Sequence, residues 1–322
     1  MKTKLSGNPL LPGQGVCDPH VHIFNNKAYM YATHDKAPKN TSFVMEDWWV
    51  WSSPDLVNWK HECTLFPKDI HLEPGFKACW ATDAAEKNGK YYWYFSEGKY
   101  TGVVVGDTPV GPWRDPLKKP LVGEGIVPVN PYDPGILIDD DGTPYLIFGV
   151  WDYYIARLND DMISLAEKPR KVIVNNPEGP YGVGKTDDKS FLHKRNGIYY
   201  LSWGCFYGMS KNVYGPYECK GSIIKEENVA PELRYADKAL SLDAWKRFAG
   251  KEQPTELYKK YAITFDRHGS FFEWHNQWYF ICNEMTVTKN TFYRDSSICY
   301  VNYKKNGEIE PVKLEVEGVF VK

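Results

Sequence analysis

The chain has 322 residues, a mass of 37.1 kDa and a net charge of −2, which excludes the strongly basic surface typical of proteins that bind nucleic acid or anionic membranes. No apolar stretch approaches the length that spans a bilayer, and the N-terminus has no apolar signal region. We therefore expect a cytoplasmic protein, or a secreted one if a leader has been removed. The seven cysteines include no Cys-x-x-Cys pair, which argues against a disulfide framework or a structural zinc site.

Aromatic residues make up 16% of the sequence, with 23 Tyr and 12 Trp. Aromatic side chains favour β-strands, and most of them fill the cores of sheets. Tyr and Trp also occur where an apolar face meets a polar edge. Because sugar rings present such mixed faces, this composition suits a carbohydrate site.

One short pattern recurs along the chain: a turn containing Asn, Asp or Gly, followed by an aromatic strand. The five copies cover residues 25–31, 88–94, 141–147, 196–202 and 275–280. Asn-Gly or Asp-Gly between apolar runs is a strong hairpin signal, and the intervals suit four-stranded blades with loops of varying length. The sequence therefore predicts an all-β fold, a single five-bladed β-propeller over residues 1–322.

Residues 226–262 interrupt the β pattern and are predicted to form a short helical insertion. Ser241 is the predicted N-cap of a helix over the following residues, with Asp243 in its first turn. An insertion of this kind is either a decoration of the surface or a wall at the rim of the substrate site, and the sequence leaves both open.

Two Asp-Pro dipeptides, at Asp18 and Asp133, precede the first and third aromatic hairpins. Each Asp stands ahead of an apolar strand, a turn and an aromatic strand. A lone Asp-Pro is a turn signal, but two in equivalent places of different blades indicate side chains that converge on the central channel. Hydrolysis of a glycosidic bond needs such a pair of carboxyl groups.

Several short motifs, each weak alone, are specific in their order and spacing. They cover residues 8–13, 18–19, 31–35, 80–83, 132–135, 139–142, 158–162, 193–197, 268–273 and 306–312. With them the chain resembles glycoside hydrolase family 43, whose members are five-bladed propellers. The resemblance implies an inverting, exo-acting hydrolase that releases pentoses from plant polysaccharides or oligosaccharides, as an α-L-arabinofuranosidase or β-xylosidase.

The resemblance also implies roles for individual residues. Asp18 matches the general base that activates water, and Asp133 matches the Asp that positions the general acid and raises its pKa. Arg294 matches an arginine that reaches the central pocket, where its planar fork can fix geometry. Trp80 matches an aromatic residue near the bound sugar, and His34 is assigned to substrate binding with them.

The general acid departs from the family pattern. The family places Glu-Gly-Pro directly ahead of the strand that begins near Phe191, where this chain has Asp187-Asp188-Lys189-Ser190. Simple register puts Asp188 at the position of the Glu, while a Glu-Gly-Pro begins upstream at Glu178. Three alternatives remain: Asp188 is the acid with a shorter side chain, a loop brings Glu178 back, or the acid comes from elsewhere or is lost. A shorter acid would need a closer backbone, because proton transfer requires hydrogen-bond reach.

His268 resembles a family histidine that lies beneath the pocket and often ligates a calcium ion whose shell is mostly water. Calcium prefers oxygen ligands, so the alternative is a hydrogen-bonded core histidine. No cofactor is expected for the chemistry, with a structural calcium in the central channel as the one metal considered.

Two further functions remain open from the sequence. The unusual acid segment is compatible with a glycosidase that acts on galactose-type sugars, or with a propeller that binds carbohydrate without cleaving it. In every case we expect an oligosaccharide or polysaccharide as the partner, and neither nucleic acid nor membrane.

Overall fold

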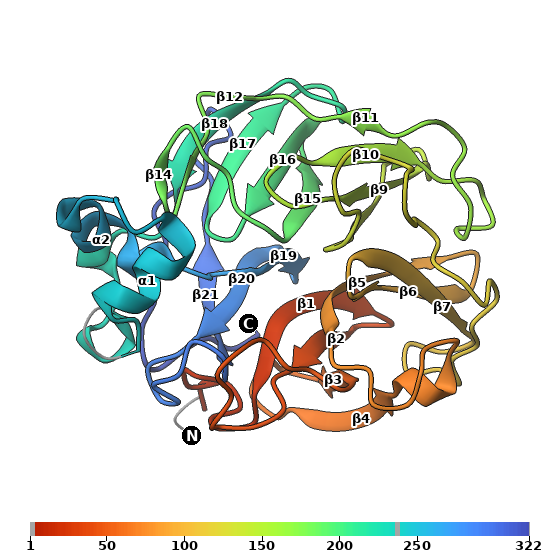
Figure 1. Cartoon of the computed structure of the whole chain (residues 1–322), viewed down its shortest axis with the longest axis horizontal. Coiled ribbons are helices and arrows are strands. Elements are labelled where there is room, and N and C mark those ends of the chain that lie inside the picture. The colour runs from red at the N-terminus through yellow and green to blue at the C-terminus, as the bar shows by residue number, and fades with distance from the viewer. Residues whose placement is uncertain (1–3, 236–238, 322) are drawn as a thin grey trace.

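The computed structural model describes residues 4–235 and 239–321. Within these residues the longer strands form five sheets that stand around a central axis as the blades of a propeller (Figure 1). Blade 1 contains β1 (Val16–Phe24), β2 (Lys27–His34), β3 (Trp48–Ser53) and β4 (Lys60–Leu65). Blade 2 contains β5 (Cys79–Lys87), β6 (Lys90–Glu97) and β7 (Tyr100–Gly106). Blade 3 contains β8 (Gly135–Ile138), β9 (Pro144–Phe148), β10 (Tyr154–Arg157) and β11 (Arg170–Lys171).

Blade 4 contains β15 (Ser190–Arg195), β16 (Ile198–Trp203), β17 (Phe206–Ser210) and β18 (Tyr217–Ser222), with β12 (Val174–Asn175) parallel to β18 at its edge. Blade 5 contains β19 (Gly269–Trp274), β20 (Gln277–Glu284) and β21 (Asp295–Val301). A small hairpin joins β13 (Glu178–Gly179) to β14 (Gly182–Val183). The predicted five-bladed propeller is confirmed.

Each of the five aromatic repeats is the second strand of its blade, paired antiparallel to the innermost strand. Four of these hairpins turn through two residues that both have positive φ: Asn25-Asn26, Asn88-Gly89, Asn196-Gly197 and His275-Asn276. Positive φ at both positions is the geometry of a type I′ turn, which Asn and Gly tolerate and which matches the twist of the strands. The local sequence therefore fixes the inner hairpin of each blade.

The two ends of the chain close the ring beside blade 5. The backbone N–H groups of Ser6 and Asn8 donate to the carbonyls of Val319 and Val316, both at 2.8 Å, and Leu10 N–H donates to Ser296 O at 2.8 Å. The N-terminal segment thus bridges the C-terminal segment and β21.

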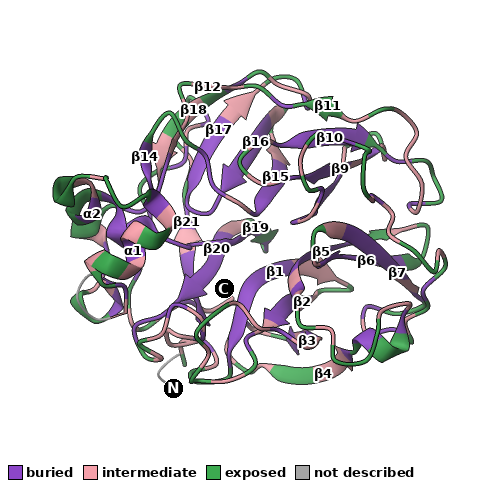
Figure 2. Ribbon diagram, in the orientation of Figure 1, coloured by how far each residue is buried: buried purple, intermediate pink, exposed green. Residues whose placement is uncertain are grey.

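The hydrophobic core lies between neighbouring blades, whose strands are largely buried (Figure 2). Between blades 1 and 2, for example, the rings of Tyr31 and Trp93 lie 5.3 Å apart and both side chains are fully buried. Packing of this kind holds adjacent sheets face to face, so the inner strands are held at fixed positions around the axis.

The predicted helical insertion is present between blades 4 and 5. It contains the α-helices α1 (Leu242–Ala249) and α2 (Thr255–Tyr261) and the short 3₁₀ turns η2 (Glu226–Asn228), η3 (Pro231–Leu233) and η4 (Ala262–Thr264); a further turn, η1 (Pro67–Asp69), follows β4. Ser241 caps α1 as predicted, since its Oγ accepts the N–H of Ala244 at 3.1 Å. Trp245 of α1 is fully buried and donates from Nε1 to Pro180 O at 3.1 Å, which ties the insertion to the β13–β14 hairpin.

The helices of the described ranges are all too short or too polar to cross a bilayer.

Candidate active site

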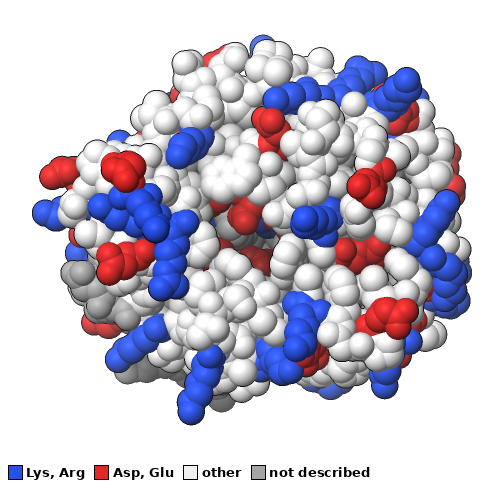
Figure 3. Space-filling view, in the orientation of Figure 1, with Lys and Arg blue, Asp and Glu red and all other residues white. Residues whose placement is uncertain are grey.

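A pocket of about 130 Å³ opens at the central axis, on the face shown in Figure 3, where acidic side chains are visible in the central hollow. Aromatic and aliphatic side chains form part of its wall, and a dense set of charged groups forms the rest. The lining residues are Asp18, Phe43, Met45, Trp80, Ala81, Tyr132, Asp133, Asp188, Lys189, Asp266, His268 and Arg294.

Four charged residues of the pocket lie at or near the start of an inner strand and have positive φ. The angles are 46° at Asp18, 58° at Asp133, 44° at Lys189 and 50° at Asp266. Non-glycine residues rarely adopt this conformation, and such residues cluster at functional sites. The same positive-φ backbone conformation thus recurs in blades 1, 3, 4 and 5 at residues that lie at the axis.

Asp18 is buried and every contact around its carboxylate is a donor. Its Oδ1 accepts from Asn283 Nδ2 at 2.8 Å and from Arg294 Nη1 at 3.2 Å, while its Oδ2 accepts from Thr33 Oγ1 at 3.1 Å. Hydrogen bonds and a cation favour the ionised form of a carboxyl group. Donors from three different segments of the chain thus hold the Asp18 carboxylate in place.

Arg294 joins three buried carboxylates. Besides Asp18, its Nε donates to Asp35 Oδ2 at 3.0 Å and its Nη1 to Asp266 Oδ2 at 3.3 Å. Its guanidinium also lies 4.9 Å from the ring of Phe43. The structure therefore places Arg294 in the pocket, as expected, where it neutralises and positions the acids.

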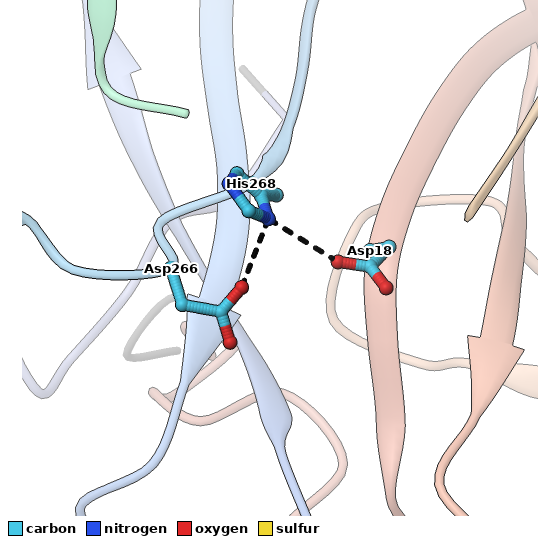
Figure 4. A group of neighbouring side chains, drawn as sticks. All are labelled: Asp18, Asp266 and His268. Atoms are coloured by element: carbon cyan, nitrogen blue, oxygen red, sulfur yellow. Dashed lines mark ion pairs between the residues drawn. The ribbon is translucent and has the colours of Figure 1, made fainter. Parts of the chain in front are cut away.

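His268 lies among four carboxylates. On one side, Nδ1 is 2.9 Å from Asp266 Oδ1 and 3.8 Å from Asp18 Oδ1 (Figure 4). On the other side, Nε2 is 3.1 Å from Asp187 Oδ2 and 2.8 Å from Asp188 Oδ1. Burial alone would lower the pKa of His268, but Asp188 and Asp187 outweigh it and raise that pKa well above its usual value. Both ring nitrogens thus face carboxylate oxygens, and Nε2 is hydrogen-bonded to Asp187 Oδ2.

Asp133 is buried beside the same group. Its Oδ1 accepts from Ser96 Oγ at 3.1 Å and its Oδ2 from the backbone N–H of Lys189 at 3.1 Å. Burial, and then the charge of Asp188, raise the pKa of Asp133 to about 7, against the opposing effect of Lys189. Burial and Asp188 raise the pKa of Asp187 to about 7 in the same way. Neighbouring carboxyls that cannot all ionise share protons, so this group holds protons near neutral pH.

The two acids considered from the sequence occupy different places. Asp188 lines the pocket with its side chain 40% exposed, across the His268 ring from Asp18. Glu178 does not line the pocket: its Oε1 accepts from Tyr261 Oη at 2.6 Å and from Lys260 Nζ at 3.3 Å, at the helical insertion. The structure thus brings Asp188, and not Glu178, to the carboxylates of the site.

Trp80 lines the pocket and its ring lies 5.6 Å from that of Tyr132, another lining residue. His34 lies elsewhere. Its Nδ1 is 2.8 Å from Asp47 Oδ1, and its ring stacks on Trp49 at 3.6 Å. Of the residues assigned to sugar binding, Trp80 and Arg294 are therefore at the pocket wall and His34 is not.

On the Nδ1 side of His268, the two neighbouring carboxylates have little capacity left for a calcium ion. The candidate ligands Asp18, Asp266 and His268 lie within 4.8 Å of one another. However, both carboxylates already accept from Arg294 and Asn283, and the third donor is a nitrogen. Calcium takes six to eight oxygen ligands. The guanidinium of Arg294 supplies positive charge to both carboxylates here.

Sequence reasoning missed Lys189, Asp266 and Asn283. Asp266 could have been found, because it precedes the inner strand of blade 5 much as Asp18-Pro19 and Asp133-Pro134 mark the first strands of blades 1 and 3. Lys189 is 1% exposed and donates from Nζ to Pro134 O at 2.5 Å. No local pattern indicates that a lysine will be buried, because its surroundings come from other blades.

A family model described as glycosyl hydrolases family 43 matches residues 6–309. The chain belongs to this family. It is 26% identical to a xylosidase/arabinosidase of Bacteroides ovatus, over 96% of this chain and 97% of that protein. It is 29% identical to a β-D-galactofuranosidase of Aspergillus niger, over 98% of this chain and 87% of that protein.

Among solved family 43 structures, a β-xylosidase/α-arabinofuranosidase from a compost microbial metagenome superposes with a TM-score of 0.72. It is 25% identical, with coverage of 96% of this chain and 97% of that one. That structure contains xylotriose and is a calcium-free form. The family 43 chain described here is accordingly a glycoside hydrolase, and its paired carboxyl groups are to be read in terms of glycosidic bond cleavage.

Proposed function

We propose that this family 43 hydrolase removes terminal pentose units, arabinofuranose or xylose, from oligosaccharides or polysaccharides with inversion of configuration. The observation that carries the proposal is the placement of Asp18 and Asp188 on opposite sides of the His268 ring at one pocket. Inverting enzymes hold their two carboxyls about 6.5–9.5 Å apart, which leaves room for a water molecule between base and sugar. A ring between the two carboxyls suits that separation.

In the proposed reaction Asp18 removes a proton from water while the water oxygen attacks the anomeric carbon. The bond from that carbon to the leaving oxygen breaks, and Asp188 passes to this oxygen a proton from the group that it shares with Asp133 and Asp187. Asp133 and Asp187 share the protons of the group near neutral pH. The small pocket at the axis, with Trp80 in its wall, suits one sugar at a chain end, which fits the exo-acting mode.

The choice of acid is tested with the matched variants Asp188→Asn and Glu178→Gln. General acid catalysis contributes about 10²- to 10⁴-fold, so Asp188→Asn should lower kcat by this factor on a xylo-oligosaccharide. The loss should be far smaller on a 2,4-dinitrophenyl glycoside, whose leaving group needs no proton. Glu178→Gln should keep the wild-type rate on both substrates. Equal losses for Asp188→Asn on both substrates would contradict its role as the acid.

Hydrolysis itself is tested by comparing the wild type with Asp18→Ala on p-nitrophenyl α-L-arabinofuranoside and β-D-xylopyranoside. Indistinguishable rates would favour a propeller that only binds carbohydrate. Proton NMR of the first product formed reports its anomeric configuration, and retention would contradict the inverting assignment.

A galactofuranosidase is the second candidate, because the Aspergillus niger relative with 29% identity carries that name. Arabinofuranose and galactofuranose share a five-membered ring, so one pocket could discriminate between them only at the exocyclic carbons. Adding p-nitrophenyl β-D-galactofuranoside to the substrate panel decides between the two.

A further inference from the structure

A second cavity, of about 570 Å³, lies on blades 3 and 4 next to the helical insertion. Its walls are the loop 151–153, the segment 171–174, Pro177, the segment 184–186 and Phe248 of α1. We call it the Trp151 groove. Its size falls in the range of about 300–1,000 Å³ that is common for ligand sites, and its lining mixes apolar side chains with a few charged ones.

Trp151 is the most unusual residue of this groove. The residue is 45% exposed and its φ is 66°, which is rare for a bulky residue. Its backbone carbonyl accepts from Thr186 Oγ1 at 2.7 Å, and its ring packs 5.3 Å from Tyr181. A strained conformation costs of order 1–3 kcal/mol and persists only where its surroundings hold it. Here the surrounding contacts hold the Trp151 indole in a position that is exposed to solvent.

The groove borders the catalytic pocket, although the two cavities share no lining residue. The backbone N–H of Trp151 donates to Asp187 O at 3.3 Å, directly before Asp188. On the other side, the Phe248 ring, which lines the groove, lies 6.3 Å from the ring of Phe43, which lines the pocket. The helical insertion is thus a wall shared by both cavities.

The direction of the reaction connects the two cavities. A general acid must lie within hydrogen-bond reach of the oxygen that it protonates. If Asp188 is that acid, the leaving group departs on the Asp188 side of the pocket. On that side, the backbone of Trp151 is hydrogen-bonded to Asp187, and the Trp151 indole is an exposed apolar surface. Ile173, which is 53% exposed, lines the same groove.

We propose that the Trp151 groove binds the leaving-group chain of an oligomeric or polymeric glycan. This inference rests on the proposed function and extends it from the terminal sugar to the chain behind it. The apolar face of a sugar ring stacks on Trp151, because aromatic rings accept such mixed faces. Asp152 and Lys171 form an ion pair of 2.9 Å at the rim of the groove, and both side chains are about half exposed. They supply an acceptor and a donor for hydrogen bonds with the hydroxyl groups of the sugar.

The test compares substrates that fill only the pocket with substrates that also reach the groove. Wild-type kcat/KM should rise along a series of xylo-oligosaccharides of increasing length and their arabinose-substituted forms, relative to the p-nitrophenyl glycoside. In Trp151→Ala this rise should shrink by about 3- to 10-fold, mainly through KM, which is the scale of one aromatic stacking contact.

Two further variants keep the test decisive. Ile173→Ser changes the groove without touching the segment that carries Asp188, and it should also flatten the dependence on chain length. Phe66→Ala, an aromatic of similar exposure (40%) that does not line either cavity, should leave the dependence as in the wild type.

The outcomes separate the two proposals. Two results would overturn the groove proposal alone. One is a wild type that cleaves the glycosides with no dependence of kcat/KM on chain length. The other is a set of variants that lower kcat/KM equally for all substrates. A wild type that cleaves no glycoside would overturn the proposed function.

Discussion

Arg294 offers a quantitative test of the electrostatics beneath the pocket. It is 3% exposed and contacts Asp18, Asp35 and Asp266, which are all buried. Breaking one buried ion pair costs about 3–5 kcal/mol, because it leaves an uncompensated charge. In Arg294→Met three carboxylates lose the same cation, and such losses are not additive. We expect the free energy of unfolding to fall by about 5 kcal/mol at pH 7.5, a large share of the roughly 5–15 kcal/mol of a typical domain.

The sign of the pH dependence follows from the same contacts. Burial raises the pKa of Asp35, and Arg294 opposes this rise. Without Arg294 the folded-state pKa of the carboxyl increases further, so stability is present at low pH and is lost as the pH rises through that value. The loss in Arg294→Met should therefore be smaller at pH 5 than at pH 7.5.

The measurement is urea denaturation followed by tryptophan fluorescence at both pH values. Arg294→Lys keeps a positive charge but loses the planar fork, so it should lose less stability and show a weaker pH dependence. Arg114→Met, which removes an exposed pair with Asp107, serves as the surface control and should match the wild type. A loss in Arg294→Met below about 1 kcal/mol, the scale of an exposed pair, or one equal at both pH values would refute the reasoning.

Three further predictions address the site and its support. Because Lys189 lowers the pKa of Asp133 from within the pocket, Lys189→Met should shift the alkaline limb of the kcat/KM profile to higher pH, and an unshifted limb would contradict this coupling. Because the carboxylates on the Nδ1 side of His268 have little capacity left for a calcium ion, EDTA treatment and added Ca²⁺ should leave kcat unchanged, as activity assays can check. A Cβ at Gly269 would lie 1.8 Å from Ile281 O. Gly269→Ala should therefore destabilise the protein by about 3 kcal/mol or more, as measured by thermal unfolding. A variant as stable as the wild type would contradict this and show that β19 can move.

The helical insertion shows how one segment serves both stability and the site. Trp245 anchors α1 to the β13–β14 hairpin through Pro180, and Phe248 on the same helix stands between the pocket and the Trp151 groove. The sequence left a surface decoration and a rim wall open. The structure favours the wall, because the face of α1 that carries Phe248 is turned toward Phe43.

Residues 187–190 show that sequence register alone does not decide which carboxyl group reaches the pocket. Register alone pointed to Asp188, while the Glu-Gly-Pro motif pointed to Glu178. The contacts that separate them are Glu178 with Tyr261 and Asp188 with His268, both formed between residues about 80 positions apart. Neither pairing leaves a signal in a short stretch of sequence.

The sequence by itself determined the inner hairpins, and through their repetition the number of blades. Turns such as Asn88-Gly89 and Asn196-Gly197 select their φ angles locally, and the alternating aromatic strands need only their neighbours to pair. The positions of Asp18 and Asp133 at equivalent places in two blades were readable for the same reason.

Only the tertiary structure decided what surrounds those carboxyls. Burial of Lys189, the threefold contact of Arg294, the exclusion of His34 and Glu178 from the pocket and the outward indole of Trp151 all depend on how blades pack around the axis. Charges and burial act through space, so residues from all five blades set the chemistry of one pocket, and no single blade contains the information.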